Sequence, residues 1–292
     1  MPRRYTALAV SAGVALTLTA CTSPSSAPRS TPAVVADLGV EHVHGLGTDP
    51  ADGTLYAATH FGLFRLPEQG EAERVADRFQ DTMGFTVVGP GTFIGSGHPD
   101  FRMDPDLPTR LGLIRSEDAG DSWEIVSLGD QVDFHVLQAL HDSIYGWDAS
   151  SGGLMVSADD GRTWETRSTL DLRDFVVDPA APGTLLATTP QGPMRSGDDG
   201  RSWQPVPGAP ALAVLAWPSD GSLYGVTAEG TVHASGNGGS SWTARSTVGG
   251  EPEALYAENG NGGEGAIYVA VSPGTILVSN DGGTTFRVRY RE

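Results

Sequence analysis

Short runs in which apolar and polar residues alternate cover most of the chain after residue 40. Clusters of Gly, Pro, Asp and Ser separate one run from the next. Such alternation is typical of β-strands that bury one face, so the pattern predicts an all-β protein. The runs fall into six groups, and the first run of each group lies at residues 42–50, 83–89, 134–140, 173–179, 212–218 and 253–259.

An eight-residue pattern, Ser-x-Asp-x-Gly-x-Ser/Thr-Trp, occurs five times with small drift in its later copies. The copies begin at Ser116, Ser157, Ser196, Ser235 and Ser279, so they are separated by 41, 39, 39 and 44 residues. This period is the length of one four-stranded propeller blade. Five groups with a copy and one group without it predict a six-bladed β-propeller.

Each copy of the pattern has the composition of a tight turn between two strands. Its third residue can accept hydrogen bonds from backbone N–H groups further along the turn, and its Gly can adopt a positive φ. The aromatic residue at its end is expected to start the next strand and to pack between sheets. The residues at the third position are Asp118, Asp159, Asp198, Asn237 and Asp281.

The repeat resembles the Asp-box, or bacterial neuraminidase repeat, of the sialidase-type propellers. The resemblance implies a sialidase-like six-bladed β-propeller with Asp-box turns in blades two to six. In that family the box lies on the outer rim, away from the active site. The resemblance therefore implies a fold and leaves the chemistry open.

The start of the chain predicts export and lipidation. Arg3 and Arg4 precede an apolar stretch at residues 7–18, which is short for a membrane span, and Leu18-Thr19-Ala20-Cys21 follows. This segment resembles a bacterial lipobox, which implies a lipoprotein signal peptide at 1–20 and a lipidated Cys21. The alternative is that Cys21 is an incidental residue of a signal peptide.

A flexible Ser/Pro/Thr linker is expected at residues 21–36, and the propeller at 37–292. On this interpretation the protein is anchored by lipid to the extracytoplasmic face of the cell membrane. Cys21 is the only cysteine, so the propeller must be stabilised without disulfides. The formal net charge of −18 argues against nucleic acid and anionic lipid headgroups as ligands.

Histidines gather where the predicted blades place their ligand-binding face. In a propeller, the start of the innermost strand and the loop after the second strand lie on one face. The residues at these positions in blades one to three are His42, His44, His60, Met83, His98 and His135. Imidazoles and a thioether favour copper, whereas imidazoles alone suit zinc equally well. The alternative is that these histidines form hydrogen bonds between blades and bind no metal.

Carboxylates form a second set of candidate site residues. Asp100 lies just before the long FRMDPDLPTR loop, and Asp148 and Asp174 also map near the channel mouth. Two carboxylates that flank a glycosidic bond can catalyse its hydrolysis, so these three residues are the candidate catalytic acids. In an acidic protein they can equally be solvated loop residues.

Sialidases also use an arginine clamp for the substrate carboxylate and a Tyr/Glu pair. Arg102 and Arg173 are the available clamp members, and Glu253 with Tyr256 is the available pair, but no arginine lies at the mouth of blade one. These differences from the sialidase pattern argue against sialidase activity and leave neutral sugars open as substrates.

The segments HVHGLGTDP, ATHFGLFRL, MGFTVVG and GSGHPD resemble a group of bacterial lipoproteins labelled glycosyl hydrolases. Other propellers with this box, such as the sortilin ectodomain and a photosystem II assembly factor, are receptors or assembly factors. The sequence thus leads to two hypotheses: an anchored binding module with a copper or zinc site, or an extracytoplasmic glycoside hydrolase. A third is a protein-binding scaffold that uses Trp147 and Trp217 as contacts.

Overall fold

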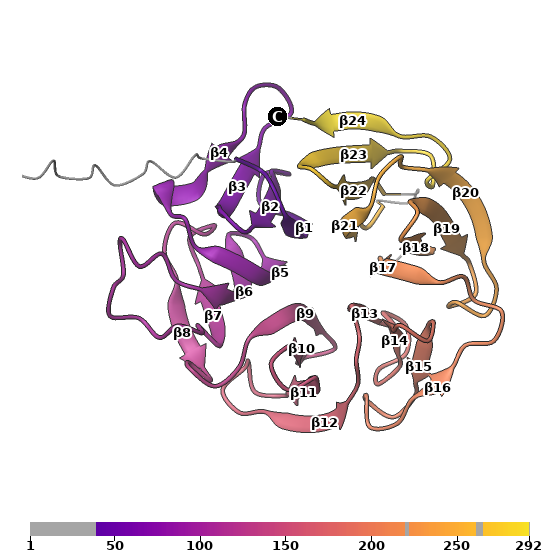
Figure 1. The fold of residues 1–292 in the computed structure, drawn as a ribbon, viewed down its shortest axis with the longest axis horizontal. Helices are drawn as coiled ribbons and strands as arrows, with labels where there is room; N and C mark the ends of the chain where they lie inside the picture. Colours follow the sequence, from indigo (N-terminus) through magenta and orange to yellow (C-terminus); the bar gives the residue numbers. More distant parts are fainter. Residues whose placement is uncertain (1–38, 220–221, 261–264, 292) are drawn as a thin grey trace, which may run out of the picture. The chain divides into compact units, whose positions relative to one another are not determined.

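Six four-stranded antiparallel sheets surround a central channel, which confirms the predicted six-bladed β-propeller (Figure 1). The computed structural model describes residues 39–219, 222–260 and 265–291. The predicted signal peptide at 1–20 and linker at 21–36, with Cys21, lie outside the described residues. Among the residues that are described, no helix is both long enough and apolar enough to span a bilayer.

Each blade is built from four strands that are consecutive in the chain. Blades 1 to 3 contain β1 (Val43–Thr48), β2 (Leu55–Thr59), β3 (Gly62–Leu66), β4 (Glu73–Arg74), β5 (Asp81–Gly89), β6 (Thr92–His98), β7 (Leu113–Ser116), β8 (Glu124–Ser127), β9 (Phe134–Leu140), β10 (Ser143–Asp148), β11 (Gly153–Ser157) and β12 (Glu165–Thr169). Blades 4 to 6 contain β13 (Asp174–Val177), β14 (Leu185–Thr188), β15 (Met194–Ser196), β16 (Gln204–Pro205), β17 (Leu212–Ala216), β18 (Leu223–Thr227), β19 (Thr231–Ser235), β20 (Thr243–Thr247), β21 (Pro252–Ala257), β22 (Ile267–Val271), β23 (Thr275–Ser279) and β24 (Arg287–Tyr290).

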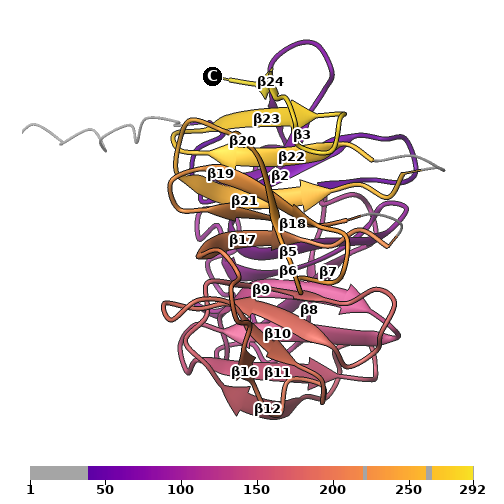
Figure 2. The same ribbon diagram turned by 90° about the vertical axis from the view of Figure 1, so that its right-hand side faces the viewer.

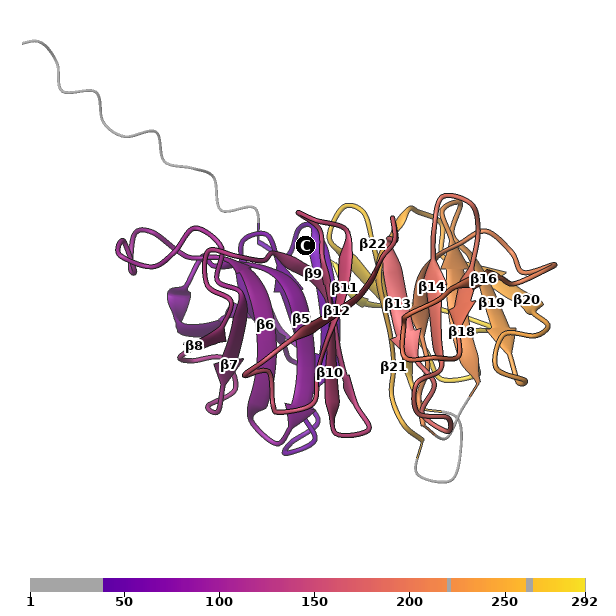
Figure 3. The ribbon, with the colours of Figure 1, turned by 90° about the horizontal axis from the view of Figure 1, so that it is seen from below.

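The first strand of each blade is the innermost one and lines the channel (Figure 1). These strands contact one another in order around the ring, and β21 of the last blade contacts β1 of the first. The strands of blades 2 and 3 run roughly along the ring axis, so their connections lie on the two faces of the ring (Figures 2 and 3). The start of β1 and the β2–β3 connection thus lie on one face, as do their counterparts in the other blades.

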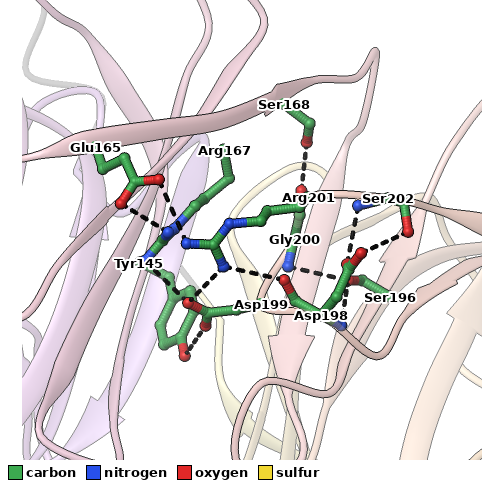
Figure 4. Close-up of polar contacts among 10 residues, drawn as sticks. All are labelled: Tyr145, Glu165, Arg167, Ser168, Ser196, Asp198, Asp199, Gly200, Arg201 and Ser202. Carbon is green, nitrogen blue, oxygen red and sulfur yellow. Dashed lines mark hydrogen bonds and ion pairs between the residues drawn. The ribbon is translucent and has the colours of Figure 1, made fainter.

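Four of the five octapeptide turns share one hydrogen-bond network, shown for blade 4 in Figure 4, whereas in blade 5 Asn237 Nδ2 donates to Ser241 Oγ at 2.9 Å. Ser196 Oγ accepts a hydrogen bond from Gly200 N at 2.9 Å, and Asp198 Oδ1 accepts one from Ser202 N at 2.8 Å. Ser202 Oγ donates to Asp198 Oδ2 at 2.6 Å. The turn therefore satisfies its own polar groups, as its sequence predicts.

Each seam between neighbouring blades is filled by a hydrophobic cluster. At the seam between blades 1 and 2, Tyr56 and Leu63 of blade 1 pack with Phe85 and Phe93 of blade 2, and Trp123 covers them. The aromatic residue that ends each octapeptide packs against such a cluster, in the order Trp123, Trp164, Trp203, Trp242 and Phe286. The octapeptides therefore join blades as well as closing hairpins.

The outer strand of blade 1 is shorter than its sequence indicates. Of the segment ERVADRF at residues 73–79, only Glu73–Arg74 forms a strand, β4, and the 3-10 helix η1 (Val75–Asp77) follows it. Ala76 and Asp77 have φ values of 54° and 50°, so the backbone turns out of the sheet. Arg78 N then donates to Val75 O and closes this turn at 3.2 Å.

Candidate functional site

β-Bulges at the start of several inner strands determine which side chains reach the channel. Pairing shifts between Val43 and Gly45 in β1 and between Thr82 and Gly84 in β5, so His44 and Met83 are the extra residues of two bulges. The same irregularity makes His135 the extra residue of β9. A bulge redirects the side chain of its extra residue. The three residues that the sequence aligned at one position are thus placed equivalently, and all three line the channel cavity.

His44, His60 and Asp81 form a cluster across the seam between blades 1 and 2. His44 Nε2 lies 3.5 Å from Asp81 Oδ1, and His60 Nδ1 lies 3.0 Å from Asp81 Oδ2. One potential ligand atom from each of the three residues lies within 4.8 Å of the others. His44 Nε2 and Asp81 Oδ1 are both buried and have no hydrogen-bond partner among the described residues.

His42 lies next to this cluster. The ring centroids of His42, His44 and His60 are 6.3 to 6.4 Å apart, so the three imidazoles form a nearly equilateral triangle. His42 has a φ of 53°, a left-handed conformation that is uncommon for a residue other than Gly. The backbone at His42 is therefore held in a conformation that a regular strand would not adopt.

His98 and His135 do not join this cluster but meet a different carboxylate, Asp133. His135 Nε2 lies 3.1 Å and His98 Nε2 3.7 Å from Asp133 Oδ2, at the seam between blades 2 and 3. The six residues predicted for one metal site are thus divided: five histidines belong to or lie beside two separate clusters, and Met83 lines the channel cavity.

Sequence reasoning missed the two carboxylates that organise these clusters, Asp81 and Asp133. Each lies two residues before the bulge residue of its blade, at the position that His42 has in blade 1. Alignment of the three inner strands on their bulges was the only signal that could have identified them, because neither residue belongs to a motif.

The channel cavity has a volume of about 690 Å³ and lies inside the ring of inner strands. Its lining includes His44, Met83 and His135 on one side and Asp174, Trp217 and Glu253 from blades 4 to 6. Glu253 Oε2 accepts a hydrogen bond from Val43 N at 3.1 Å, across the seam between blades 6 and 1.

The three candidate catalytic carboxylates do not meet one another at the cavity. Asp100 and Asp148 are buried and do not line it, whereas Asp174 does. Asp148 Oδ1 accepts hydrogen bonds from Asp133 N at 2.9 Å and Ser150 Oγ at 2.7 Å, so it fixes the β10–β11 turn against β9.

Asp100 holds the long loop after β6. Its carboxylate accepts two hydrogen bonds from the Arg102 guanidinium, at 2.9 and 2.7 Å, and one from Phe79 N at 2.9 Å. The hydrogen bonds from Arg102 hold the pKa of Asp100 well below its usual range. Arg102 also lies over the Phe79 ring, 4.0 Å from its centroid, so this candidate clamp member is used within the loop.

Asp174 differs from the other two because it lines the cavity, is only half-buried as a residue, and accepts fewer hydrogen bonds through its carboxyl group. Burial raises the pKa of Asp174 to about 7, and the hydrogen bond from Leu215 N to Oδ2, at 2.7 Å, only partly opposes this shift. A carboxyl group with such a pKa is partly protonated at neutral pH, as a general acid requires.

The remaining candidate residues have structural contacts. Arg173 Nη2 donates to Pro252 O at 2.6 Å and so links blades 4 and 6 across the channel. Trp147 donates from Nε1 to Leu170 O at 2.9 Å and packs on the core of its seam. Trp217 and Tyr256 line the channel cavity and also pack on hydrophobic clusters.

Comparison with solved structures supports the propeller fold. The chain is similar to a GH74 xyloglucanase from Xanthomonas campestris, with a TM-score of 0.58, 20% identity and 86% of this chain covered. It is also similar to a gluconolactonase from Xanthomonas campestris, with a TM-score of 0.65 and 13% identity over 86% of this chain and 88% of that one. A chain of a nidogen/laminin complex gives a TM-score of 0.59 and 14% identity over 80% of this chain and 91% of that one.

These identities are too low to carry more than the fold. The chain spans 45% of the length of the xyloglucanase, so that enzyme contains a large part without a counterpart here. No protein-family profile and no curated protein matches the chain. The shared feature is a β-propeller, which hosts many unrelated functions.

Proposed function

We propose that this protein is an extracytoplasmic binding module that holds a copper or zinc ion at the rim of its propeller channel. The ligands are His44, His60 and Asp81, and His42 is placed to supply a fourth. Nitrogen and carboxylate donors in this combination suit both metals. We also propose that Cys21 is lipidated and anchors the protein to the membrane, and that the octapeptide turns are Asp-boxes.

The observation that carries the proposal is a pair of buried atoms at the seam between blades 1 and 2 that lie 3.5 Å apart without a hydrogen bond. His44 Nε2 and Asp81 Oδ1 have no hydrogen-bond partner among the described residues, although both are buried. A buried polar atom without a hydrogen-bond partner costs about 1–3 kcal/mol of folding free energy, so most buried polar atoms in folded proteins have a partner. A metal ion bound between them would give both atoms a ligand bond and could also bind the nearby Nδ1 of His60.

Metal titration of protein purified without a histidine tag tests the proposal. We expect saturable binding of Zn²⁺ or Cu²⁺ that Asp81→Asn and His44→Ala each weaken at least tenfold. His233→Ala is the matched control, because His233 lies in β19 of blade 5, away from the cluster. Equal metal affinity of the wild type and the three variants would rule out a metal site at this cluster.

The anchor is tested separately. Cys21→Ser should release the protein from the membrane fraction into the soluble fraction and abolish incorporation of labelled palmitate. A Cys21→Ser protein that stays with the membrane to the same extent as wild type would contradict lipidation at this residue.

Glycoside hydrolysis is the second candidate function, and Asp174 is the observation that favours it. This carboxyl group lines the channel cavity and has a pKa raised to about 7 by burial. The similar structures include two GH74 proteins. Turnover of an aryl glycoside that Asp174→Asn abolishes would support this function, whereas absence of turnover over a broad panel of aryl glycosides would count against it.

A further inference from the structure

The seam between blades 4 and 5 lacks the carboxylates that neutralise arginines at two other seams. Between blades 1 and 2, Arg65 Nη2 of β3 donates to Asp121 Oδ1 in the next octapeptide at 2.9 Å. Between blades 3 and 4, Asp199 in the octapeptide of blade 4 forms ion pairs with two arginines, at 3.0 and 3.6 Å (Figure 4). The octapeptide of blade 5 reads SGNGGSSW, so Ser240 stands at the position of Asp121 and Gly238 at that of Asp199.

Arg195 of β15 is the arginine that this octapeptide leaves without a carboxylate. It has the position of Arg65, since each pairs with the second residue of the preceding strand of its blade. Within the described part of the chain Arg195 forms no ion pair, and its Nη2 is buried without a hydrogen-bond partner. A Cβ at Gly239 would lie 3.3 Å from Nη2, so the guanidinium lies against the octapeptide of blade 5.

The indole of Trp242 is a second donor without an acceptor at this seam. One seam earlier, Trp203 Nε1 donates to Ser168 Oγ of the preceding blade at 3.0 Å. Pro207 has the position of Ser168 in blade 4 and has no hydroxyl group. Trp242 Nε1 is buried and has no hydrogen-bond partner among the described residues. A Cβ at Gly239 would lie 3.4 Å from Trp242 Cζ2, the ring carbon nearest the N–H edge, so both donors lie beside this glycine.

A pocket of about 500 Å³ opens at the same place, between β15 and β16 of blade 4 and the octapeptide of blade 5. Its volume is within the range of small-molecule sites, about 300–1,000 Å³. Arg195 is its only charged lining residue, Pro205, Val206 and Pro207 form an apolar wall, and Ser240 adds a hydroxyl group. The pocket shares no lining residue with the channel cavity, so it is separate from the His/Asp clusters.

We propose that this pocket binds a small organic monocarboxylate with an apolar body. Guanidinium and indole groups donate hydrogen bonds and cannot accept them, so the missing partner is an acceptor. The planar fork of arginine matches the two oxygens of a carboxylate, and rotation of the Arg195 guanidinium brings it to a carboxylate in the pocket. The net charge of −18 disfavours ligands with several negative charges. This inference is independent of the proposed metal site, because the two share no residue.

Titration of the full chain with benzoate tests the inference, followed by the NMR signal of the Trp242 indole N–H, which Trp242→Phe identifies. We expect saturable binding that shifts this signal. Benzamide has the same shape without the charge and should bind at least about tenfold more weakly, as should benzoate to Arg195→Gln. Arg115→Gln is the matched control, because Arg115 also directly precedes its octapeptide but bonds to Glu117 at 3.3 Å, and it should bind benzoate like the wild type.

Ser240→Asp is the reciprocal variant. It places a carboxylate where Asp121 meets Arg65 at the first seam, so it should supply the missing acceptor from within the chain and abolish benzoate binding. Circular dichroism shows whether each variant is folded. Absence of saturable binding in the wild type, equal affinity in Arg195→Gln, or full affinity in a folded Ser240→Asp would each overturn the site.

Discussion

At the scale of single residues, Asp174 makes stability depend on pH. Because burial raises its pKa from 3.8 to about 7, the folded protein holds this proton more tightly than the unfolded chain. The stabilising effect of the proton is complete below about pH 4, declines as pH rises, and is lost above pH 7. At pH 8 the protein thus bears the full cost of a buried carboxylate, at most about 4 kcal/mol from ~1.36 kcal/mol per pKa unit.

Asp174→Asn should therefore stabilise the protein at pH 8 by an amount that disappears near pH 4. An amide can still accept the hydrogen bond from Leu215 N, so the substitution removes the charge and keeps the contact. Urea unfolding at the two pH values measures the difference. The control is Asp171→Asn, which affects an exposed carboxylate three residues earlier in the chain. An equal effect of Asp174→Asn at both pH values would contradict the raised pKa.

Single residues also mark the limit of what the sequence could predict about the site. His44, His60, His98 and His135 were identifiable because histidine is scarce, with seven in 292 residues, so its placement on one face was a signal. Asp81 and Asp133 were not, because they are two of 36 acidic residues and follow no motif. The division of the histidines into two clusters depends on side-chain directions at bulges, which alternation alone does not give.

At the scale of elements, the octapeptide turns were predictable because each one satisfies itself locally. The contacts between each turn and the preceding blade could not be predicted from the sequence. Ser168 Oγ of β12 donates to Gly200 O at 2.6 Å and accepts from Trp203 Nε1 at 3.0 Å, which joins blade 3 to the turn of blade 4. Around it, Arg167 and Arg201 form ion pairs with Asp199 at 3.0 and 3.6 Å (Figure 4).

Alanine at Ser168 and at its counterpart in blade 5, Ser246, should lower the free energy of unfolding by different amounts. Ser168→Ala leaves both a carbonyl and an indole N–H without a partner and should cost about 2 kcal/mol of unfolding free energy. Ser246 has the same position in blade 5 and donates to Gly283 O at 2.7 Å, but Phe286 stands where Trp203 does and has no N–H. Ser246→Ala should thus cost about 1 kcal/mol. Urea unfolding of both variants measures the difference, and equal losses would show that the indole bond contributes nothing.

At the scale of the whole molecule, no blade among the described residues includes a strand from the other end of the chain. Residues 34–38 lie outside the described part of the chain, and Gly39 is in no strand. Every blade completes its four strands from consecutive chain, so the contact between blades 6 and 1 depends on side chains. Val43, Leu46 and Phe64 of blade 1 pack there with Ala254 and Ile276 of blade 6.

Arg289 adds a polar clasp to this closing seam. From β24, the outer strand of blade 6, its Nη1 and Nη2 donate to Pro67 O and Leu66 O of blade 1, both at 2.8 Å. Such bonds from a charged donor each contribute about 1.5–3 kcal/mol when buried, and solvent screening reduces this for the half-buried Arg289.

Arg289→Ala should therefore lower the free energy of unfolding by about 2 kcal/mol, because it removes both bonds and exposes the two carbonyl groups. Arg287→Ala is the matched control: it removes the same charge from the same strand at an exposed position and should change stability by less than about 0.5 kcal/mol. Urea unfolding at neutral pH compares the two variants. Similar effects of both would mean that the ring closes without a contribution from Arg289, whereas the predicted difference would show that Arg289 stabilises this seam in addition to the hydrogen bond between Val43 and Glu253.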